Sequence, residues 1–271
     1  MSDSGTAFGG SMPEFYQRYL VPMIFEPHAR ILAAGLADLT SGRVLEVAAG
    51  TGAVTRALTN VLPAAVAITA TDLNETMLSQ ARVQPGFERV EWRHADAMSL
   101  PFPDRHFDAL VCQFGVMFFP DKPASFREAL RVLRPGGRYV FNVWDRMALN
   151  VLNDTARQII CDLFPIDPPR RHLIPFSYCD QGIIRADLGV AGFQDVAIEI
   201  ITERSRAATA SEAANGYFRG TNATNEIAAR GPGWLERAIK ETASVLAARF
   251  GHGPIAMPNQ ALLVTARRSP D

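Results

Sequence analysis

Hydrophobic and polar positions follow two alternating periods across the middle of the chain. Short apolar runs rich in β-branched residues predict buried strands at 43–48, 65–71, 89–93, 107–113 and 138–144. Segments whose apolar positions recur every three or four residues predict helices at 53–62, 74–83 and 122–133. Strands that alternate with helices in this way predict a mostly parallel sheet covered by helices on both faces.

Local signals mark the ends of two of these helices. Asn74 and Asp121 stand where the capping residue of a helix amino terminus belongs. Pro123 suits a first helical turn, where its missing N–H costs nothing. The Pro-Gly-Gly sequence at 135–137 predicts the turn that leads into the next strand.

The amino-terminal region has a helical pattern over 13–39, which we expect Pro22 and Pro27 to interrupt. Residues 1–10 lack the charged and then apolar pattern of a signal peptide, and they predict a flexible tail. After Asp145 the strand–helix alternation stops. The predicted elements there are helices over 146–190 with a Pro-rich break, a strand at 195–203, helices over 209–250 and a last strand at 260–267.

These elements predict an α/β fold with a doubly wound, seven-stranded, mostly parallel sheet, an antiparallel terminal strand and helical lid insertions. We expect a core and three kinds of addition. The core spans 41–145. The additions are an amino-terminal helical lid segment (1–40), helical lid or substrate insertions (146–190 and 205–255) and terminal strands that complete the core sheet (191–204 and 256–271).

A glycine loop follows the first predicted strand. Gly50 and Gly52 open a tight turn just before the helix that begins at Ala53, so a ligand could approach the backbone and meet free amide groups. Asp72 ends the next strand, 20 residues after Gly52, where an acidic residue would hold two ribose hydroxyls. The spacing predicts a site for an adenosine-containing cofactor.

Two cofactor classes remain open at this point, and charge favours one of them. A dinucleotide site usually has a third glycine, but the third position of the pattern is Thr55 here. Glu46 would also stand close to a pyrophosphate, which is an unfavourable pairing of like charges. A carboxylate would instead favour the sulfonium and ammonium groups of S-adenosylmethionine.

Five segments in order resemble the class I S-adenosylmethionine-dependent methyltransferases. They are most similar to the small-molecule (type-11) branch, which includes ubiquinone and menaquinone biosynthesis enzymes, and the resemblance spans about 43–144. The first motif usually has glycine where this chain has Ala48. The segments are 44–52, 72–78, 96–102, 107–114 and 133–137.

The resemblance implies a role for each matching residue. Asp72 would hold the ribose hydroxyls, Leu73 and Met77 would pack near the adenine, and Gln113 would lie near the methionine part. Asp96 would accept a hydrogen bond from the adenine amino group. The other residues expected at the cofactor are Tyr16, Glu46, Ala48, Gly50, Gly52, Ala97 and Met98.

The acceptor is constrained less tightly than the cofactor. Apolar residues after the fourth core strand predict an apolar or aromatic acceptor, although they could equally pack a lid against the sheet. These residues are Phe114, Met117, Phe118 and Phe119. Much of the rate of methyl transfer can come from positioning, so a catalytic residue is not required and none is assigned. Candidates for a base or an acceptor contact are His28, His172, Tyr178 and Tyr217.

Composition narrows the other partners. The formal net charge is −1 and the 27 basic residues are scattered, which argues against a nucleic-acid surface. No apolar run approaches the roughly 20 residues that cross a bilayer. Three cysteines form a sparse, odd set that predicts reduced thiols and a cytoplasmic protein. The spacing of Cys161, His172 and Cys179 matches no common zinc pattern, so no metal is expected.

The sequence therefore predicts an S-adenosylmethionine-dependent enzyme that methylates a small, apolar or aromatic metabolite. An oxygen, carbon or nitrogen acceptor atom and any oligomeric state stay open. The alternatives are a nicotinamide-dependent oxidoreductase, which the glycine loop disfavours, and a non-catalytic S-adenosylmethionine-binding protein.

Overall fold

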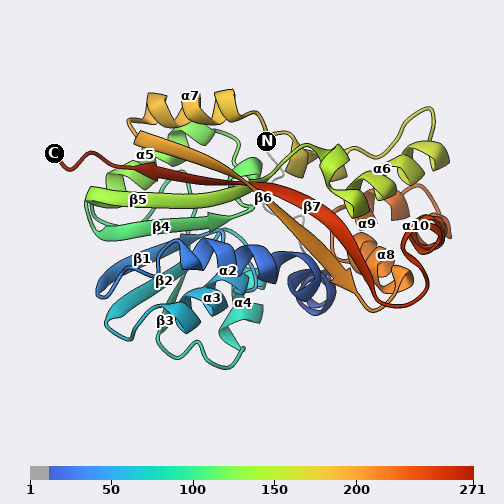
Figure 1. The fold of residues 1–271 in the computed structure, drawn as a ribbon, viewed down its shortest axis with the longest axis horizontal. Helices are drawn as coiled ribbons and strands as arrows, with labels where there is room; N and C mark the ends of the chain where they lie inside the picture. The colour runs from blue at the N-terminus through green and yellow to red at the C-terminus, as the bar shows by residue number, and fades with distance from the viewer. Residues whose placement is uncertain (1–11) are drawn as a thin grey trace. The chain divides into compact units, whose positions relative to one another are not determined.

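The computed structural model describes residues 12–271, and these divide into two compact units (Figure 1). The sheet unit comprises residues 28–144, 178–201 and 261–271. The helical unit comprises the described residues 12–27, 145–177 and 202–260. The tail predicted at residues 1–10 lies outside the described residues, as does the amino-terminal end of the predicted lid segment.

The sheet contains seven strands in the order β3-β2-β1-β4-β5-β7-β6. Strands β1 to β5 pair in parallel, whereas β7 runs antiparallel to β5. The predicted fold class is therefore confirmed. The strands are β1 (Gly42–Val47), β2 (Val66–Asp72), β3 (Val90–His94), β4 (Phe107–Gln113), β5 (Leu133–Trp144), β6 (Gln194–Ala207) and β7 (Ile255–Arg267).

Alternate residues of the central strands form the two halves of the core. Val44 and Val111 pack with apolar residues of α2 and α3 on one face of the sheet. On the other face, the ring of Phe126 from α5 contacts Tyr139 and Phe141 of β5. Figure 1 shows α2 and α3 on one side of β1 to β5 and α7 with α5 on the other. The helices that cover the sheet are α2 (Glu26–Ala34), α3 (Ala53–Val61), α4 (Glu75–Arg82), α5 (Lys122–Val132) and α7 (Gln181–Ala191).

The predicted helix caps are confirmed. Oδ1 of Asn74 accepts a hydrogen bond from the Thr76 N–H at 2.9 Å. Oδ1 of Asp121 accepts from the Ala124 N–H at 2.8 Å. Since each cap satisfies an N–H that has no partner within its helix, α4 and α5 begin where the sequence indicates.

Helix α7 groups with the sheet unit, although the predicted lid segment 146–190 included most of it. Asp180 starts this helix by accepting from the Gly182 N–H at 2.7 Å, and α7 then packs against α5. The unit boundary at Ser177 therefore follows the Pro-rich break rather than the end of the helical pattern.

The helical unit is built around α8 and α10, which pack against each other, and α6 packs against both. Tyr217 and Phe218 on α8 and Leu246 on α10 are buried in its core. Its elements are α1 (Met12–Phe15), the π-helix η1 (Tyr16–Phe25), the short helix η3 (Met147–Leu149), α6 (Val151–Leu163), η4 (Arg171–Phe176), α8 (Ala210–Arg219), α9 (Ala223–Ala228) and α10 (Trp234–Phe250).

The prediction that prolines interrupt the amino-terminal helical region is wrong. The chain stays helical from residue 12 to residue 34, with Pro22 inside the π-helix and Pro27 in the first turn of α2. The N–H of Glu26 donates to the Val21 carbonyl five residues earlier. We attribute the continuity to this wider turn, because a proline in an ordinary α-helix clashes with the carbonyl four residues before it.

Strands β6 and β7 are longer than predicted, by the segments 204–207 and 255–259. Charged residues in the first segment and Pro258 in the second weakened the apolar signal there. No helix in the described part of the chain is long and apolar enough to cross a membrane.

Candidate functional site

The loop between β1 and α3 leaves open space beside its backbone. Gly50 and Gly52 have φ angles of 58° and 91°, in the left-handed region that favours glycine. A Cβ atom added to Gly50 would meet nothing within 4 Å, whereas one on Gly52 would lie 3.0 Å from the Phe87 ring. The loop can therefore present its backbone to a ligand at Gly50 and is closely packed at Gly52.

Asp72 links this loop to the end of β2. Its Oδ2 accepts from the Gly50 N–H at 2.7 Å, and its Oδ1 accepts from the Asn74 N–H at 2.8 Å. Burial raises the pKa of this half-buried carboxyl, and the two backbone hydrogen bonds oppose that shift. The structure thus brings together the first two predicted motifs at the carboxyl edge of the sheet.

Glu46 lies inside the sheet unit, with its side chain 1% exposed. Its Oε2 accepts from the Thr55 hydroxyl on α3 at 2.6 Å. Burial raises the pKa of Glu46 to about 8, and the neighbouring Asp72 charge adds to the shift. The carboxyl is therefore mostly protonated at neutral pH. The predicted charge attraction to a sulfonium requires the ionised form of Glu46, and it stays a prediction.

The third motif forms a tight turn after β3. Oδ1 of Asp96 accepts from the Met98 N–H at 2.9 Å, and the Asp96 carbonyl accepts from Ser99 at 3.0 Å. Asp96 and Met98 are half-buried, and Ala97 is buried. The N–H of Ala95 donates to the Asp72 carbonyl at 3.1 Å, which ties this turn to the end of β2.

Leu73 and Met77, both predicted near the adenine, differ in exposure. Leu73 is 46% exposed at the end of β2, so its side chain is accessible to a ligand. Met77 is 4% exposed and packs into the core from α4.

Gln113 ends β4 beside a residue that sequence reasoning missed. The Asn142 amide Nδ2 lies 3.4 Å from the Gln113 Oε1. The N–H of Phe114 is 3.0 Å from Asn142 Oδ1 and 3.1 Å from its carbonyl oxygen, which lets both accept. A polar residue within the apolar pattern of β5 was the available signal for Asn142.

The sequence motifs did not predict three further features of the loops. Ala48 and Phe114 adopt positive φ angles of 56° and 51°, which residues other than glycine rarely do. The buried hydroxyl of Thr51 has no hydrogen-bond partner among residues 12–271. No sequence pattern marks this hydroxyl.

The remaining candidates lie in both units. Tyr16 belongs to the helical unit, where its ring stacks on Phe25 at 4.9 Å, and its contact with the cofactor stays a prediction. His28 is buried in the sheet unit with its ring 5.3 Å from that of Phe114. Tyr178 donates its hydroxyl to Asp187 at 2.7 Å. His172 and Tyr217 are buried in the helical unit.

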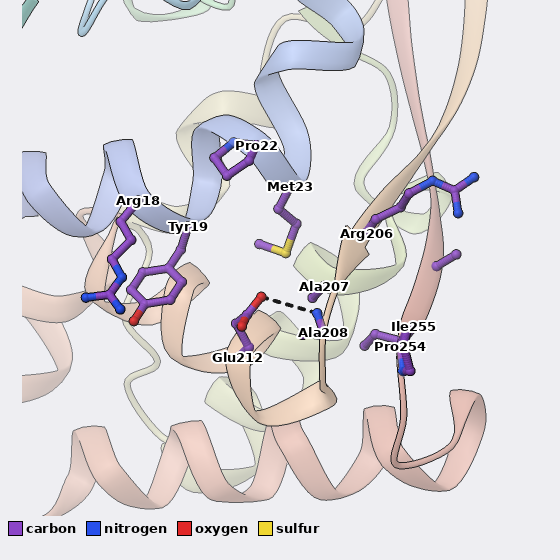
Figure 2. A pocket seen from close by; sticks show the side chains of 11 residues that line it. Arg18, Tyr19, Pro22, Met23, Arg206, Ala207, Ala208, Glu212, Pro254 and Ile255 are labelled. Atoms are coloured by element: carbon purple, nitrogen blue, oxygen red, sulfur yellow. Dashed lines mark hydrogen bonds between the residues drawn. The ribbon is translucent and has the colours of Figure 1, made fainter. Parts of the chain in front are cut away.

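A cavity of about 380 Å³ opens in the helical unit between η1, the start of α8 and the first residues of β7 (Figure 2). Figure 2 shows Met23 pointing into the space between η1 and β6, with Arg18 and Arg206 on opposite sides. Because these two cations diverge, they do not converge on one small ligand as the polar groups of a specific site do.

Comparison with known families bears directly on this arrangement. Residues 45–141 match the family described as a methyltransferase domain, a range that runs from β1 into β5. The middle of this chain therefore matches a methyltransferase domain. The predicted family is therefore confirmed, and the glycine loop, Asp72 and Asp96 all lie inside the matched methyltransferase domain.

A curated relative is the ubiquinone/menaquinone biosynthesis C-methyltransferase UbiE of Pseudomonas savastanoi, which is 41% identical over 103 residues. The match covers 36% of this chain and 40% of the relative, so it spans less than half of either protein.

Solved structures share the fold over more of the chain. The YcgJ protein from Bacillus subtilis has a TM-score of 0.57 at 21% identity and covers 90% of this chain and 99% of that one. A Haemonchus contortus phosphoethanolamine methyltransferase, solved with phosphomonomethylethanolamine and S-adenosylhomocysteine, has a TM-score of 0.55 at 16% identity. It covers 97% of this chain and 61% of that one.

Proposed function

We propose that this chain transfers a methyl group from S-adenosylmethionine to a small-molecule acceptor. One observation carries the proposal: the glycine loop, Asp72 and the Asp96 turn are joined by hydrogen bonds at the carboxyl edge of a methyltransferase domain. Ligands of open α/β sheets bind at this edge. The open space beside Gly50 fits a ligand that approaches the backbone.

In this proposal each polar group binds a different part of the cofactor. The Asp72 carboxylate, which already orders the loop through Gly50, holds the ribose hydroxyls with its remaining lone pairs. Asp96 accepts from the adenine amino group, and the exposed Leu73 side chain covers the ring. The remaining assigned contacts are Tyr16, Glu46, Ala48, Gly50, Gly52, Met77, Ala97, Met98 and Gln113.

S-adenosylmethionine supplies an activated methyl group on sulfur. The chain's own contribution is then to hold an acceptor in line with that group and to exclude water. The buried Phe114 and Met117 pack inside the sheet unit, whereas Phe118 is 40% exposed and Phe119 is half-buried, so these last two rings are open to an acceptor. They support an apolar or aromatic acceptor.

The acceptor atom stays open between carbon, oxygen and nitrogen. The name of the curated relative specifies a C-methyltransferase of quinone biosynthesis, which is consistent with an unsaturated ring as acceptor. Positioning can suffice for an activated carbon, whereas a phenol or hydroxyl would need a base. A cytoplasmic location, expected from the sparse free cysteines, belongs to the same proposal.

Binding experiments test this function before any acceptor is known. We expect S-adenosylhomocysteine to bind the full chain in isothermal titration calorimetry and NADH not to bind. Asp72→Ala should weaken the affinity by about 1–3 kcal/mol, because hydrogen bonds to a charged group and the order of the Gly50 turn are lost. Asp162→Ala, at an exposed position on α6, is the matched control and should leave the affinity unchanged.

Each alternative predicts a different result. Binding of NADH without S-adenosylhomocysteine would support the nicotinamide-dependent oxidoreductase, which the family match does not favour. Equal affinities of the Asp72→Ala protein and the parent would refute the ribose assignment. If the cofactor product binds but a panel of phenols, hydroquinones and amines produces no methyl transfer, a non-catalytic binding protein becomes the better description.

A further inference from the structure

Two strained residues stand at the carboxyl ends of neighbouring strands of the sheet unit. Ala48 follows β1 with a φ of 56°, and Phe114 follows β4 with a φ of 51°. Strands β1 and β4 pair in parallel, so both residues lie at the same edge of the sheet. Left-handed backbone at non-glycine residues persists only where the surroundings enforce it, and such strain clusters at functional sites.

Ala48 fits into a space that Gly115 leaves open. A Cβ atom on Gly115 would lie 2.6 Å from the Cβ of Ala48 and 2.6 Å from Sγ of Cys112. Real Cβ atoms do not approach that closely, so the Ala48 methyl occupies room that any side chain at 115 would need. The methyl group of Ala48, in the loop after β1, therefore packs against Gly115 in the turn after β4.

The turn after β4 in turn fixes a set of three aromatic rings. The Phe114 N–H is held by both oxygens of Asn142. The Phe114 ring stacks on Trp144 at 3.9 Å, and His28 meets both rings edge-on at 5.3 and 5.4 Å. We call Phe114, Trp144 and His28 the aromatic group. All three side chains are buried in the sheet unit.

We propose that Ala48 is a positioning residue that couples the cofactor loop to the aromatic group through its contact with Gly115. The inference rests on the proposed function, because the cofactor is the ligand expected beside Gly50. The glycine usual at position 48 in this family would leave the contact empty and would adopt its φ without strain. Alanine instead transmits the position of the loop to Phe114 and Trp144.

The coupling predicts that cofactor binding changes the environment of the Trp144 ring. The chain has three tryptophans, Trp92, Trp144 and Trp234, so 5-fluorotryptophan labelling gives three ¹⁹F signals. Trp144→Phe serves only to assign its signal. We expect saturation of the full-length protein with S-adenosylhomocysteine to shift the Trp144 signal. In Ala48→Gly protein saturated with the same ligand, whatever its affinity, that shift should fall to half or less.

A methyl-swap cycle tests the contact itself. Gly115→Ala introduces the clash with Ala48, and the double variant Ala48→Gly/Gly115→Ala removes that clash. The close approach of the new methyl group to Cys112 is the same in both proteins, so it cancels in the comparison. We expect Gly115→Ala to weaken S-adenosylhomocysteine binding at least about threefold more in the parent than in the Ala48→Gly background. The reason is that substitutions of two residues in contact have non-additive effects. Gly189→Ala on α7, where an added Cβ meets nothing within 4 Å, is the matched control and should have no effect.

The outcomes separate this inference from the proposed function. If the parent protein does not bind S-adenosylhomocysteine, the proposed function fails and the coupling falls with it. If the ligand binds but Trp144 does not shift, or shifts equally in Ala48→Gly, the coupling alone is wrong. Additive effects in the cycle would also overturn it. Should Gly115→Ala not fold, the comparison of Ala48→Gly with the parent still decides.

Discussion

The two units differ in whether their buried polar groups have hydrogen-bond partners. In the sheet unit, Glu46 accepts from Thr55, Asp72 from two backbone amides, and Asn142 from Phe114. In the helical unit, several buried side-chain atoms have no hydrogen-bond partner among residues 12–271. They are both ring nitrogens of His172 and the side-chain oxygens of Gln17, Thr221, Asn222 and Thr242.

This difference follows from how each unit is assembled. Parallel strands deliver their carboxyl ends to one edge, so polar residues that end successive strands meet and satisfy one another. The helical unit draws on three separate segments, 12–27, 145–177 and 202–260 of the described chain, and its helices pack on one another. Burial also disfavours the charged form of an acid and of a base, so pH should affect the sheet unit through Glu46 and the helical unit through His172 in opposite directions.

The largest expected effect concerns Glu46 in the sheet unit. Its folded-state pKa of about 8 lies above the ordinary value of 4.5, so the folded protein binds the proton more tightly than the unfolded chain. Stability from this group is fully present below pH 4.5 and is lost as the pH rises through 8. The loss is on the order of 3–5 kcal/mol. Glu46→Gln should remove this pH dependence and be more stable than the parent at pH 8.

The measurement is urea unfolding of both proteins between pH 5 and pH 8.5, followed at Trp92 in the sheet unit through its ¹⁹F signal. Glu75→Gln, on the exposed side of α4, is the control that removes a carboxylate without removing a buried one. A parent protein whose sheet unit gains stability across this range would contradict the buried, protonated state of Glu46.

His172 should act in the opposite direction in the helical unit. Its side chain is 6% exposed, and burial lowers its pKa to about 4, with Glu226 opposing and Arg157 reinforcing the shift. The unfolded chain then binds the proton more tightly. Stability is present above pH 6.5 and falls by about 3 kcal/mol as the pH drops through 4. His172→Leu should abolish this acid sensitivity and remove two unsatisfied nitrogens.

Acid unfolding between pH 7 and pH 3.5, followed at Trp234, checks this expectation. His252→Asn replaces an exposed histidine of the same unit and should behave as the parent does. An identical acid midpoint for His172→Leu and the parent would mean that His172 is paired or hydrated in solution.

The same contrast explains which parts the sequence could predict. The order of elements from β1 to β5, the caps at Asn74 and Asp121 and the sheet class all follow from local periodicity and turn chemistry. The glycine loop and Asp72 could be predicted because each follows or ends a strand, and parallel strands align their ends. The roles of Asp96 and Gln113 rested on the resemblance to the methyltransferases. Local pattern and tertiary structure agree in this region.

Other features depend on contacts between distant residues, which a single sequence does not reveal. Alanine at position 48 looks like a small departure from a motif until Gly115 is seen opposite it. The raised pKa of Glu46 results from burial beneath α3, not from its neighbours in sequence. Pro22 predicts a helix break, yet a π-helical turn accommodates it. The helical unit offered only amphipathic patterns, so neither its packing nor its boundaries could be predicted closely.

The smallest expected effect tests an exception to the comparison. Thr51 lies in the sheet unit, yet its buried hydroxyl has no hydrogen-bond partner among the described residues. Nε of Arg138, in the same unit, also lacks a partner among them. Its carbonyl accepts from Gln84 Nε2 at 2.8 Å, so Thr51→Val should keep the loop in place. Removing an unsatisfied hydroxyl should then raise stability by up to about 1 kcal/mol.

Thr55→Val is the matched comparison, because the same chemical change four residues later removes a donor that Glu46 uses. That variant should lose about 1–3 kcal/mol, since a buried carboxyl is left without its partner. Thermal unfolding and S-adenosylhomocysteine titration of both variants separate two roles for the Thr51 hydroxyl. A gain in stability with roughly three- to tenfold weaker binding would mean that the hydroxyl is reserved for the cofactor at the expense of the unliganded fold. Unchanged binding would make it a packing defect, and a loss of stability would show that the hydroxyl already has a partner in solution.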